Sequence, residues 1–495
     1  MKSRAPRGTA VLVFCSALAL YTLTAGGSLT STDAVVTFDL TASLVERHSI
    51  ALTENVLGLE ANRGVDGRVY SQYGIGQSIY NIPFYLAGKL AMRLAPRRIG
   101  KPDTLLKAAV AMGSAVAAAI TVWLIWGLSR RLGASSQAAS VAALTAAISS
   151  PLWPYSKFGF STALTAAILA AAARLLVEAV ARAKARYAAA AGAVLAFGWL
   201  TRHEMTVVLL PFVGAVALGA RESGRRFPWS SVAALLAATC VGGLIWAWYN
   251  FVRFGSPLSV GYSPLLDFSG YAAFLASPAG SVFVFAPIII VWAIGSSDAR
   301  FSRSTRMLLA GPLVASYAFY GALADWPGGR SYGPRYLVPA LVLLAPGAAA
   351  LWDSSRRKRQ LIGTACVAAA VLQLPGVLVD YAKVSTDWAR THTREEVAQR
   401  NWRWPSSPLV LNAEAAFEAV PANFAFLSGV RVPPRVATTS TASDRDFGQQ
   451  LSFSLDFWWL YLLYLHAIRP AVSALIAATL CAIAVVSARL AWNGG

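Results

Sequence analysis

Long apolar runs alternate with short polar segments along most of the chain. A helix that crosses a bilayer core needs roughly 20 predominantly apolar residues. About twelve runs approach this length, and they lie near residues 10–28, 104–128, 135–152, 159–176, 187–201, 204–220, 230–251, 279–296, 307–324, 335–352, 361–380 and 470–491. The pattern predicts an all-α polytopic membrane protein built as a bundle of about twelve transmembrane helices.

The first run resembles a secretory signal peptide, because the basic residues Lys2, Arg4 and Arg7 precede it. It continues to Gly26 without a small-residue cleavage site, and many further apolar runs follow it. We therefore interpret it as a retained first transmembrane helix.

The basic residues orient the predicted bundle, because Lys and Arg hold short loops on the cytoplasmic side of a membrane. With a cytoplasmic N-terminus, the alternate loops on that side contain Arg130 and Arg131; Arg182, Lys184 and Arg186; Arg221, Arg225 and Arg226; Arg300, Arg303 and Arg306; and Arg356, Arg357, Lys358 and Arg359. This side then has 20 Lys and Arg against 4 Asp and Glu, whereas the remainder has 23 and 19. We expect both termini in the cytoplasm.

Residues 73–95 are apolar but do not fit as a span, because counting them would move Arg130 and Arg131 to the outer side. Gly74, Gly76, Pro83 and Gly88 also weaken a free-standing helix there. We predict a helix lying on the outer leaflet. The alternative is a true second span with a different topology.

Composition excludes several classes of protein. Hydrophobic residues make up 56% of the 495 residues and charged residues only 13%, against about a quarter charged in soluble domains. The chain is therefore neither a soluble enzyme nor disordered, and its net charge of +20 reflects membrane orientation rather than nucleic-acid binding. The four cysteines lie within apolar runs and the four histidines are scattered, so we expect no disulfide framework, metal site or cofactor.

Two large segments, residues 29–103 and 381–469, fall on the predicted outer side and contain most of the polar chemistry. The first begins with Asp33 and Asp39, and the apolar spacing of residues 34–48 suits a helix along the membrane surface. Asp33 is either the N-cap of that helix or a carboxylate that acts as a general base. Asp39 is the weaker candidate, because it falls within the helix.

The segment DGRVYSQYGIGQS, residues 66–78, begins with an Asp-Gly turn. It then presents a polar and aromatic series, which consists of Arg68, Tyr70, Gln72, Tyr73 and Gln77. One interpretation is a hairpin beside a surface helix. The other is a pocket wall that contacts a phosphate or a sugar.

Three shorter outer loops show the same enrichment in Arg and aromatic residues. Their candidate pocket residues are Arg202, His203 and Glu204; Asn250, Arg253 and Tyr262; and Trp326, Arg330, Tyr332, Arg335 and Tyr336. The planar guanidinium of Arg binds phosphate oxygens through two hydrogen bonds. The alternative is an aromatic belt at the membrane surface with Arg reaching lipid headgroups.

The second outer segment is expected to form a small appended domain. It contains Asp444 and Asp446, at a spacing that some sugar-transfer enzymes use to hold a divalent metal. The surrounding residues are rich in Ser and Thr, which is typical of an exposed loop. We therefore expect no metal site there.

The motifs DGRVYSQYGIGQS, NFVRFGSPLSVGY and WPGGRSYGPRYLVP, after a basic first helix and an outer loop that begins with Asp, resemble bacterial integral-membrane glycosyltransferases of the GT-C class. They are most similar to the branch related to protein O-mannosyltransferases and lipid A aminoarabinose transferases. The resemblance covers roughly residues 1–380 and implies a catalytic transmembrane module there. Residues 381–469 would follow as the outer segment, and residues 470–495 as the final helix and C-terminus.

The resemblance implies roles for individual residues. Asp33 matches the catalytic acid of the first outer loop, Arg253 and Arg335 best match the cations that hold the donor phosphate, and Arg330 and Arg68 are further candidates. Relatives commonly have a Lys where Gln72 and Tyr73 stand, and Lys157 occupies the region where a second outer carboxylate is often found. Lys157 is therefore a further candidate for a phosphate contact.

The expected function is inverting transfer of a sugar from a polyprenyl-phosphate carrier to a lipid, glycan or protein acceptor, at the outer face of a bacterial plasma membrane. Membrane lipids are expected partners and nucleic acids are not. One alternative is a polysaccharide polymerase or ligase that uses lipid-linked oligosaccharide. Another alternative is a transporter. Two observations disfavour it: the sequence shows no evident internal repeat, and its polar residues lie at helix ends instead of span centres.

Overall fold

The computed structural model describes residues 7–95, 103–262, 265–429, 455–464 and 467–493. Within these ranges the chain is mainly helical. The strands found there are β1 (Ala61–Arg63) and β2 (Val69–Ser71), which pair antiparallel with Ala61 opposite Ser71. The predicted all-α fold class is confirmed.

Among the described residues, six helical segments are long and apolar enough to cross a membrane, judged by length and composition. They are α4 (Thr104–Arg131), α7 (Ser161–Arg182), η3 (His203–Val208) with α9 (Leu209–Glu222), α10 (Trp229–Phe254), α17 (Arg356–Leu378) and α23 (Pro470–Asn493). The membrane-protein class predicted from the apolar runs is therefore confirmed.

The remaining predicted runs form helices that are shorter, less apolar or interrupted. They are α1 (Arg7–Leu23), α5 (Ser136–Ile148), α8 (Ala185–Thr201), α12 (Val282–Phe285), α13 (Ile288–Ser296), α14 (Arg303–Tyr320), α15 (Val338–Leu341), η4 (Val342–Leu344) and α16 (Pro346–Trp352). Proline explains one interruption. Pro346 has no N–H to continue the helical hydrogen bonds, so a new helix begins there.

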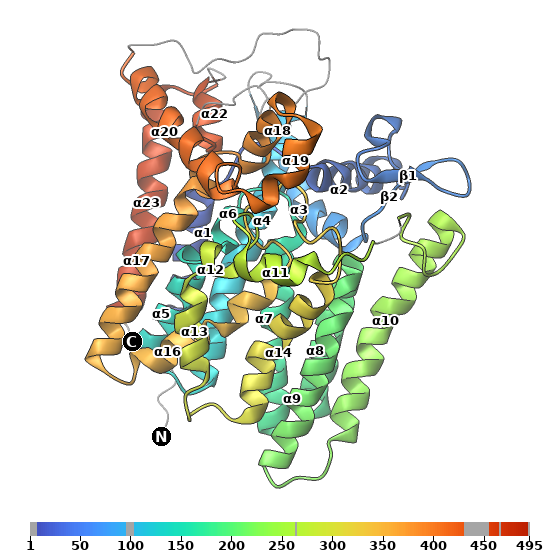
Figure 1. Ribbon diagram of the computed structural model, residues 1–495, viewed down its shortest axis with the longest axis vertical. Helices are drawn as coiled ribbons and strands as arrows, with labels where there is room; N and C mark the ends of the chain where they lie inside the picture. The colour runs from blue at the N-terminus through green and yellow to red at the C-terminus, as the bar shows by residue number, and fades with distance from the viewer. Residues whose placement is uncertain (1–6, 96–102, 263–264, 430–454, 465–466, 494–495) are drawn as a thin grey trace.

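The other helices lie mainly in the segments between the spans. They are α2 (Thr32–Ala42), η1 (Ser43–Arg47), η2 (Glu54–Val56), α3 (Gly76–Leu94), α6 (Leu152–Tyr155), α11 (Ser269–Ala276), α18 (Tyr381–Thr391), α19 (Arg394–Gln399), η5 (Arg400–Trp402), α20 (Pro408–Leu427) and α22 (Trp458–Tyr464). Figure 1 shows α2, the small sheet, α18, α19 and α20 gathered toward one end of the molecule, which we call the upper end. The connection between α9 and α10 lies at the opposite, lower end.

The interior is built from small residues that let helices approach closely. The most apolar stretches of α4 and α7 are each 67% buried, and α1 packs against both α4 and α23. Where α8 crosses α10, a methyl group at Gly192 or Gly242 would overlap the backbone of the facing helix. These glycines therefore set the spacing of the two helices.

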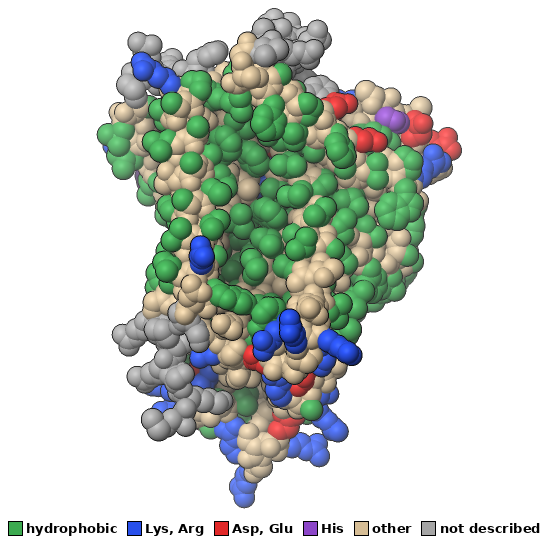
Figure 2. Space-filling view, turned by 90° about the vertical axis from the view of Figure 1, so that its left-hand side faces the viewer, with side chains coloured by type: hydrophobic (Ala, Val, Ile, Leu, Met, Phe, Trp, Pro, Cys, Tyr) green, Lys and Arg blue, Asp and Glu red, His purple; other side chains and the backbone are tan. Residues whose placement is uncertain are grey.

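One side of the molecule presents apolar side chains to its surroundings. Only 11% of the most apolar stretch of α23 is buried, which suits a helix whose outer face contacts lipid. Figure 2 shows a broad hydrophobic surface on the side that holds α17 and α23, with Lys and Arg side chains gathered below it. This separation is the one that the positive-inside rule describes.

The surface helix predicted over residues 34–48 corresponds to α2 and η1. Its N-cap is a different residue from Asp33, the cap that one of the two interpretations expected. The hydroxyl of Ser31 accepts a hydrogen bond of 3.2 Å from the backbone N–H of Ala34, so Ser31 is the N-cap. Asp33 lies in the first turn instead. The interpretation of Asp33 as the cap was therefore wrong, and its carboxylate is available for other contacts.

The two interpretations of residues 66–95 can also be compared with the structure. The Asp66–Gly67 turn joins β1 to β2, so a hairpin is formed there. The predicted helix after it is α3, which packs against α2 and α4 and is not among the six long apolar segments. Its position at a lipid surface stays a prediction.

Candidate functional site

An ion pair between Asp33 and Arg335 joins two distant parts of the chain at the upper end. Asp33 comes from the first turn of α2, and Arg335 from the loop between α14 and α15. The Arg335 guanidinium also donates to the carbonyl of Gly328 at 3.1 Å and lies 4.2 Å from the centre of the Phe160 ring. Its Nε atom is buried and has no hydrogen-bond partner among the described residues. Both residues were predicted from the sequence as site residues, and the structure brings them together.

Arg202 presents a second guanidinium to a pocket beside this pair. It lies between α8 and η3, 4.7 Å from the centre of the Tyr336 ring, and Tyr336 stacks on Tyr320 at 4.4 Å. The Nε atom is 3.9 Å from the Glu204 carboxylate, and no side-chain hydrogen bond of Arg202 occurs among the described residues. The pocket has about 290 Å³ of empty volume and is lined by Arg202, Glu204, Tyr320 and Tyr336. A planar cation in a pocket, with hydrogen-bond donors that no acceptor among the described residues engages, is suited to an anionic ligand.

Two further carboxylates lie near Asp33. Asp325 belongs to the Arg-rich outer loop that the sequence singles out, whereas Glu60 was not selected from the sequence. Glu60 accepts a hydrogen bond of 2.8 Å from the hydroxyl of Thr32, and Asp325 accepts one of 2.7 Å from the hydroxyl of Tyr336. Both residues are exposed to solvent in part. No motif marks Glu60, whose sequence context resembles an ordinary polar loop.

The pKa values of these carboxyl groups respond to their surroundings. The enclosing protein and the nearby charge of Asp33 raise the pKa of Glu60 to about 7. The pKa of Asp325 is also raised, first by the surrounding protein and then, among weaker influences, by the charge of Asp33. Asp33, Glu60, Asp325, Arg202 and Arg335 thus form one charged cluster, which we call the upper cluster.

Arg253 makes structural contacts instead of facing the upper cluster. Its side chain is buried and donates to the carbonyls of Ser71, Tyr73 and Tyr249, the last two at 3.2 Å, and to the side chain of Asn250. Arg253 therefore fastens the β1–β2 hairpin to the end of α10. These partners use most of its donors, so we assign it a positioning role.

Lys157 is likewise engaged by the protein. Its side chain is fully buried, with Nζ 2.8 Å from the Asp456 carboxylate and 3.4 Å from the carbonyl of Val379, and it also donates to the carbonyl of Val377. Desolvation lowers the pKa of Lys157, while the charge of Asp456 opposes the shift. The structure therefore leaves Lys157 no surface with which to contact a phosphate.

Asp39 holds the outer loop in place. Its carboxylate accepts hydrogen bonds from the backbone N–H of Thr53 at 2.8 Å and from the Thr53 hydroxyl at 3.2 Å. Arg47 lies 3.8 Å away. These contacts are typical of a loop anchor.

The remaining predicted pocket residues fall into two groups. Those near the upper cluster are His203, which stacks on Trp246 at 5.4 Å, with Glu204, Tyr262 and Tyr336. The others are engaged elsewhere. In and after the hairpin, Arg68 and Tyr70 contact Asp66, Gln72 and Tyr73 make hydrogen bonds through their backbone, and Gln77 donates to Asn81. In the later loops, Asn250 contacts Arg253, Trp326 donates to Ser269, Tyr332 packs on Phe285, and Arg330 is exposed. The sequence alone does not separate these groups.

No group of three or more His, Cys, Asp or Glu side chains that could hold a metal ion occurs in the part of the chain that the structure describes. Asp444 and Asp446 lie outside the described residues.

Comparison with known proteins supports the class that the fold and the motifs indicate. Residues 105–246, from α4 into α10, match the family described as dolichyl-phosphate-mannose-protein mannosyltransferase. No curated protein matches the chain. The chain has the fold of GT-C membrane glycosyltransferases, so the resemblance inferred from its motifs is confirmed.

Two solved structures of ArnT from Cupriavidus metallidurans share this fold. The one bound to undecaprenyl phosphate has a TM-score of 0.50 and 16% identity, covering 96% of this chain and 77% of that chain. The apo structure has a TM-score of 0.52 and 16% identity, covering 98% of this chain and 77% of that chain. At this identity the similarity establishes the architecture and leaves individual residues to be assigned from their contacts.

Proposed function

We propose that the protein transfers a sugar, with inversion, from a polyprenyl-phosphate-linked donor to an acceptor at the upper end of the molecule. The observation that carries this proposal is the Asp33–Arg335 pair beside the guanidinium of Arg202, which lies 3.9 Å from the Glu204 carboxylate and makes no side-chain hydrogen bond among the described residues. A proton acceptor and two cations at one site suit a reaction in which a hydroxyl loses a proton and a phosphate leaves. The fold, shared with an ArnT structure that holds undecaprenyl phosphate, is consistent with such a donor.

In the proposed reaction, the acceptor oxygen attacks the anomeric carbon while the bond from that carbon to the phosphate oxygen breaks. Arg335 and Arg202 stabilise the charge that develops on the departing polyprenyl phosphate. A bound phosphate also competes with Asp33 for the guanidinium of Arg335, which frees the Asp33 carboxylate. Asp33 then takes the proton of the acceptor hydroxyl.

Analysis of lipid-linked sugars in a deletion strain tests the proposal. Without the protein, a polyprenyl-phosphate sugar should accumulate and be detectable by mass spectrometry, and expression of the parent protein should remove it. Accumulation of a lipid-linked oligosaccharide would indicate a polymerase or ligase instead. An unchanged pool of lipid-linked sugars would contradict both functions.

Glu60 gives a prediction about stability and pH. Its pKa in the folded protein, about 7, lies above the ordinary value of 4.5. Between pH 4.5 and about 7 the Glu60 carboxyl loses its proton in the unfolded chain but keeps it in the folded protein. The free energy of unfolding therefore falls as pH rises through this range. Glu60→Gln removes this loss. We therefore expect the melting temperature of the variant, relative to the parent, to be higher at pH 7.5 than at pH 5.

Scanning fluorimetry in detergent at the two pH values measures this effect. Glu418→Gln, which changes an exposed carboxylate on α20, is the matched control and should show no comparable change. A relative melting temperature of Glu60→Gln that stays constant or falls with pH would contradict the assigned environment.

We further propose that the upper end faces the outside of a bacterial plasma membrane and the lower end the cytoplasm, following the distribution of basic residues. Single cysteines at Arg357 and Glu395, both exposed, test this in a background without the native cysteines. An impermeant maleimide added to intact cells should label position 395 only, and position 357 should react after the membrane is opened. Labelling of both positions in intact cells would contradict the orientation.

A further inference from the structure

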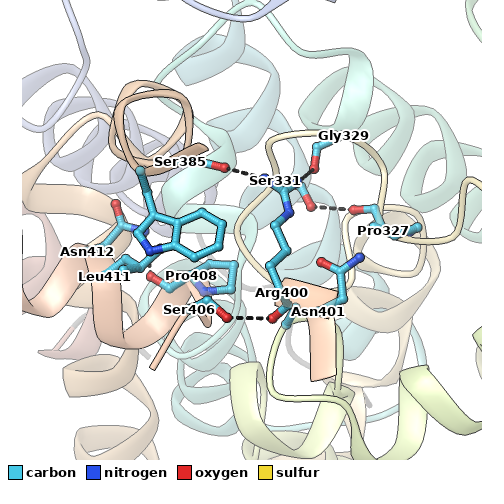
Figure 3. A pocket seen from close by; sticks show the side chains of 12 residues that line it. Pro327, Gly329, Ser331, Ser385, Arg400, Asn401, Ser406, Pro408, Leu411 and Asn412 are labelled. Carbon is cyan, nitrogen blue, oxygen red and sulfur yellow. Dashed lines mark hydrogen bonds between the residues drawn. The ribbon is translucent and has the colours of Figure 1, made fainter. Parts of the chain in front are cut away.

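A second pocket lies at the upper end, between the loop that leads to Arg335 and the appended outer segment. Its empty volume is about 410 Å³, counting the solvent space at its open side. Figure 3 shows its walls, in which residues 327–331 face side chains from α18, η5 and the start of α20. Nothing in the proposed reaction uses this pocket.

The pocket is connected to the upper cluster through two consecutive peptide groups. Arg335 donates to the carbonyl of Gly328 at 3.1 Å, and Arg400 donates to the carbonyl of Gly329 at 3.3 Å. The Arg400 side chain lines the pocket, as Figure 3 shows. The loop is therefore a wall shared by both sites, and a ligand in the pocket would lie next to the transfer site.

The lining residues have the chemistry of a saccharide site. Trp388 contributes an aromatic ring, and Ser385, Asn401 and Asn412 contribute polar groups. Asn412 is 1% exposed, its Nδ2 donates to the carbonyl of Pro408, and its Oδ1 is buried with no partner among the described residues. A buried acceptor without a donor is unfavourable, and a ligand hydroxyl would satisfy it.

The pocket also has an uncompensated positive charge. Arg400 donates to the Ser385 hydroxyl at 3.1 Å, and no carboxylate forms an ion pair with it among the described residues. Burial and the neighbouring charge of Arg330 lower the pKa of Arg400, so nearby positive charge already disfavours its ionised form. A negatively charged group on a ligand would relieve this repulsion.

We propose that this pocket binds a saccharide that carries a carboxylate or a phosphate, as part of the acceptor. Its ring would pack on Trp388, a hydroxyl would donate to Oδ1 of Asn412, and the anionic group would contact Arg400. The assignment as an acceptor site rests on the proposed function. The predicted preference for an anionic saccharide does not depend on the proposed function, because it follows from the residues that line the pocket.

Binding to the purified full-length protein in detergent tests this proposal, measured by saturation-transfer NMR titration. The probes are methyl β-glucoside, glucuronic acid and glucose 6-phosphate, which separate a neutral sugar from the two kinds of anion. We expect at least one anionic probe to bind about tenfold more tightly than the neutral one, because charge-assisted hydrogen bonds are stronger. Arg400→Gln should abolish this preference, and Trp388→Ala should weaken binding of all three probes.

Arg403→Gln is the matched control, because Arg403 is exposed and does not line the pocket. It should bind like the parent, and melting temperatures should show that each variant is folded. If Trp388→Ala is unfolded, Trp388→Phe, which keeps an aromatic ring, should retain binding. Failure of every probe to bind, equal binding of neutral and anionic probes, or an unchanged preference in Arg400→Gln would each overturn the proposal.

This experiment separates the pocket from the proposed transferase activity. Asp33→Asn should retain saccharide binding, because Asp33 does not line the pocket. Binding that follows the predicted pattern in a protein without transfer activity would support the pocket and contradict the proposed function. Transfer activity without saccharide binding would support the function and contradict the pocket.

Discussion

Replacing Asp33 with asparagine is expected to lower the rate of sugar transfer by about 100- to 10,000-fold while the protein stays folded. Asparagine cannot take the proton of the acceptor hydroxyl. It keeps the size of the side chain, and its carbonyl oxygen can still accept a hydrogen bond from Arg335. Helix α2 should remain intact, because Ser31 provides the cap.

The measurement compares transfer rates and melting temperatures of purified variants, with Asp39→Asn as the matched control. Asp39 accepts hydrogen bonds from Thr53, so we expect this control to lower the melting temperature more than the intrinsic rate. An Asp33→Asn protein that transfers sugar within a few-fold of the parent rate would show that Asp33 is not the base. Glu60 would then be the next carboxylate to test.

Substitution of Arg335 is expected to give the second large decrease in transfer activity. Arg335→Ala removes a donor to the leaving phosphate and should lower kcat/KM by about 100- to 1,000-fold. It also leaves the Asp33 carboxylate without its partner, and breaking a partly buried ion pair destabilises the fold. Arg335→Lys keeps the charge but loses the planar fork, so its activity should lie between those of the parent and the alanine variant.

Steady-state kinetics with the lipid-linked donor distinguish this role from a purely structural one. Loss of phosphate contacts should raise KM for the donor or lower kcat, without a matching loss of folded protein. Arg63→Lys changes an exposed arginine that pairs with Glu54, and it should behave like the parent. Parent-like kinetics in both Arg335 variants would contradict the assigned phosphate contact.

The general architecture could be predicted from the sequence because its causes are local. Apolar length indicates a span, so the apolar runs locate most of the long helices. The uneven helix lengths were harder to predict, since Pro346 divides a run that hydropathy alone presents as continuous. Asp33 could be selected because it lies just past the first apolar run and matches the catalytic acid that the family resemblance implies for the first outer loop.

The composition of the site depends on tertiary contacts that no local pattern contains. Asp33 and Arg335 are 302 positions apart, and only the packed bundle brings them together. Arg253 and Lys157 matched the residue type expected for a phosphate ligand, yet backbone carbonyls and Asp456 engage them. A sequence shows that a cation is present, whereas its partners decide whether it is free to bind a ligand. Glu60 was missed because its sequence context is that of an ordinary loop, and only the fold places it beside Asp33.

Release of polyprenyl phosphate by the purified protein tests the central claim most directly. The substrate is the lipid-linked sugar isolated from the deletion strain, supplied in detergent with an extract that contains the acceptor. We expect the parent protein to convert this lipid to free polyprenyl phosphate as the sugar appears on the acceptor, and Asp33→Asn to leave both unchanged. Equal conversion by the parent and Asp33→Asn, or no conversion by the parent, would contradict the account.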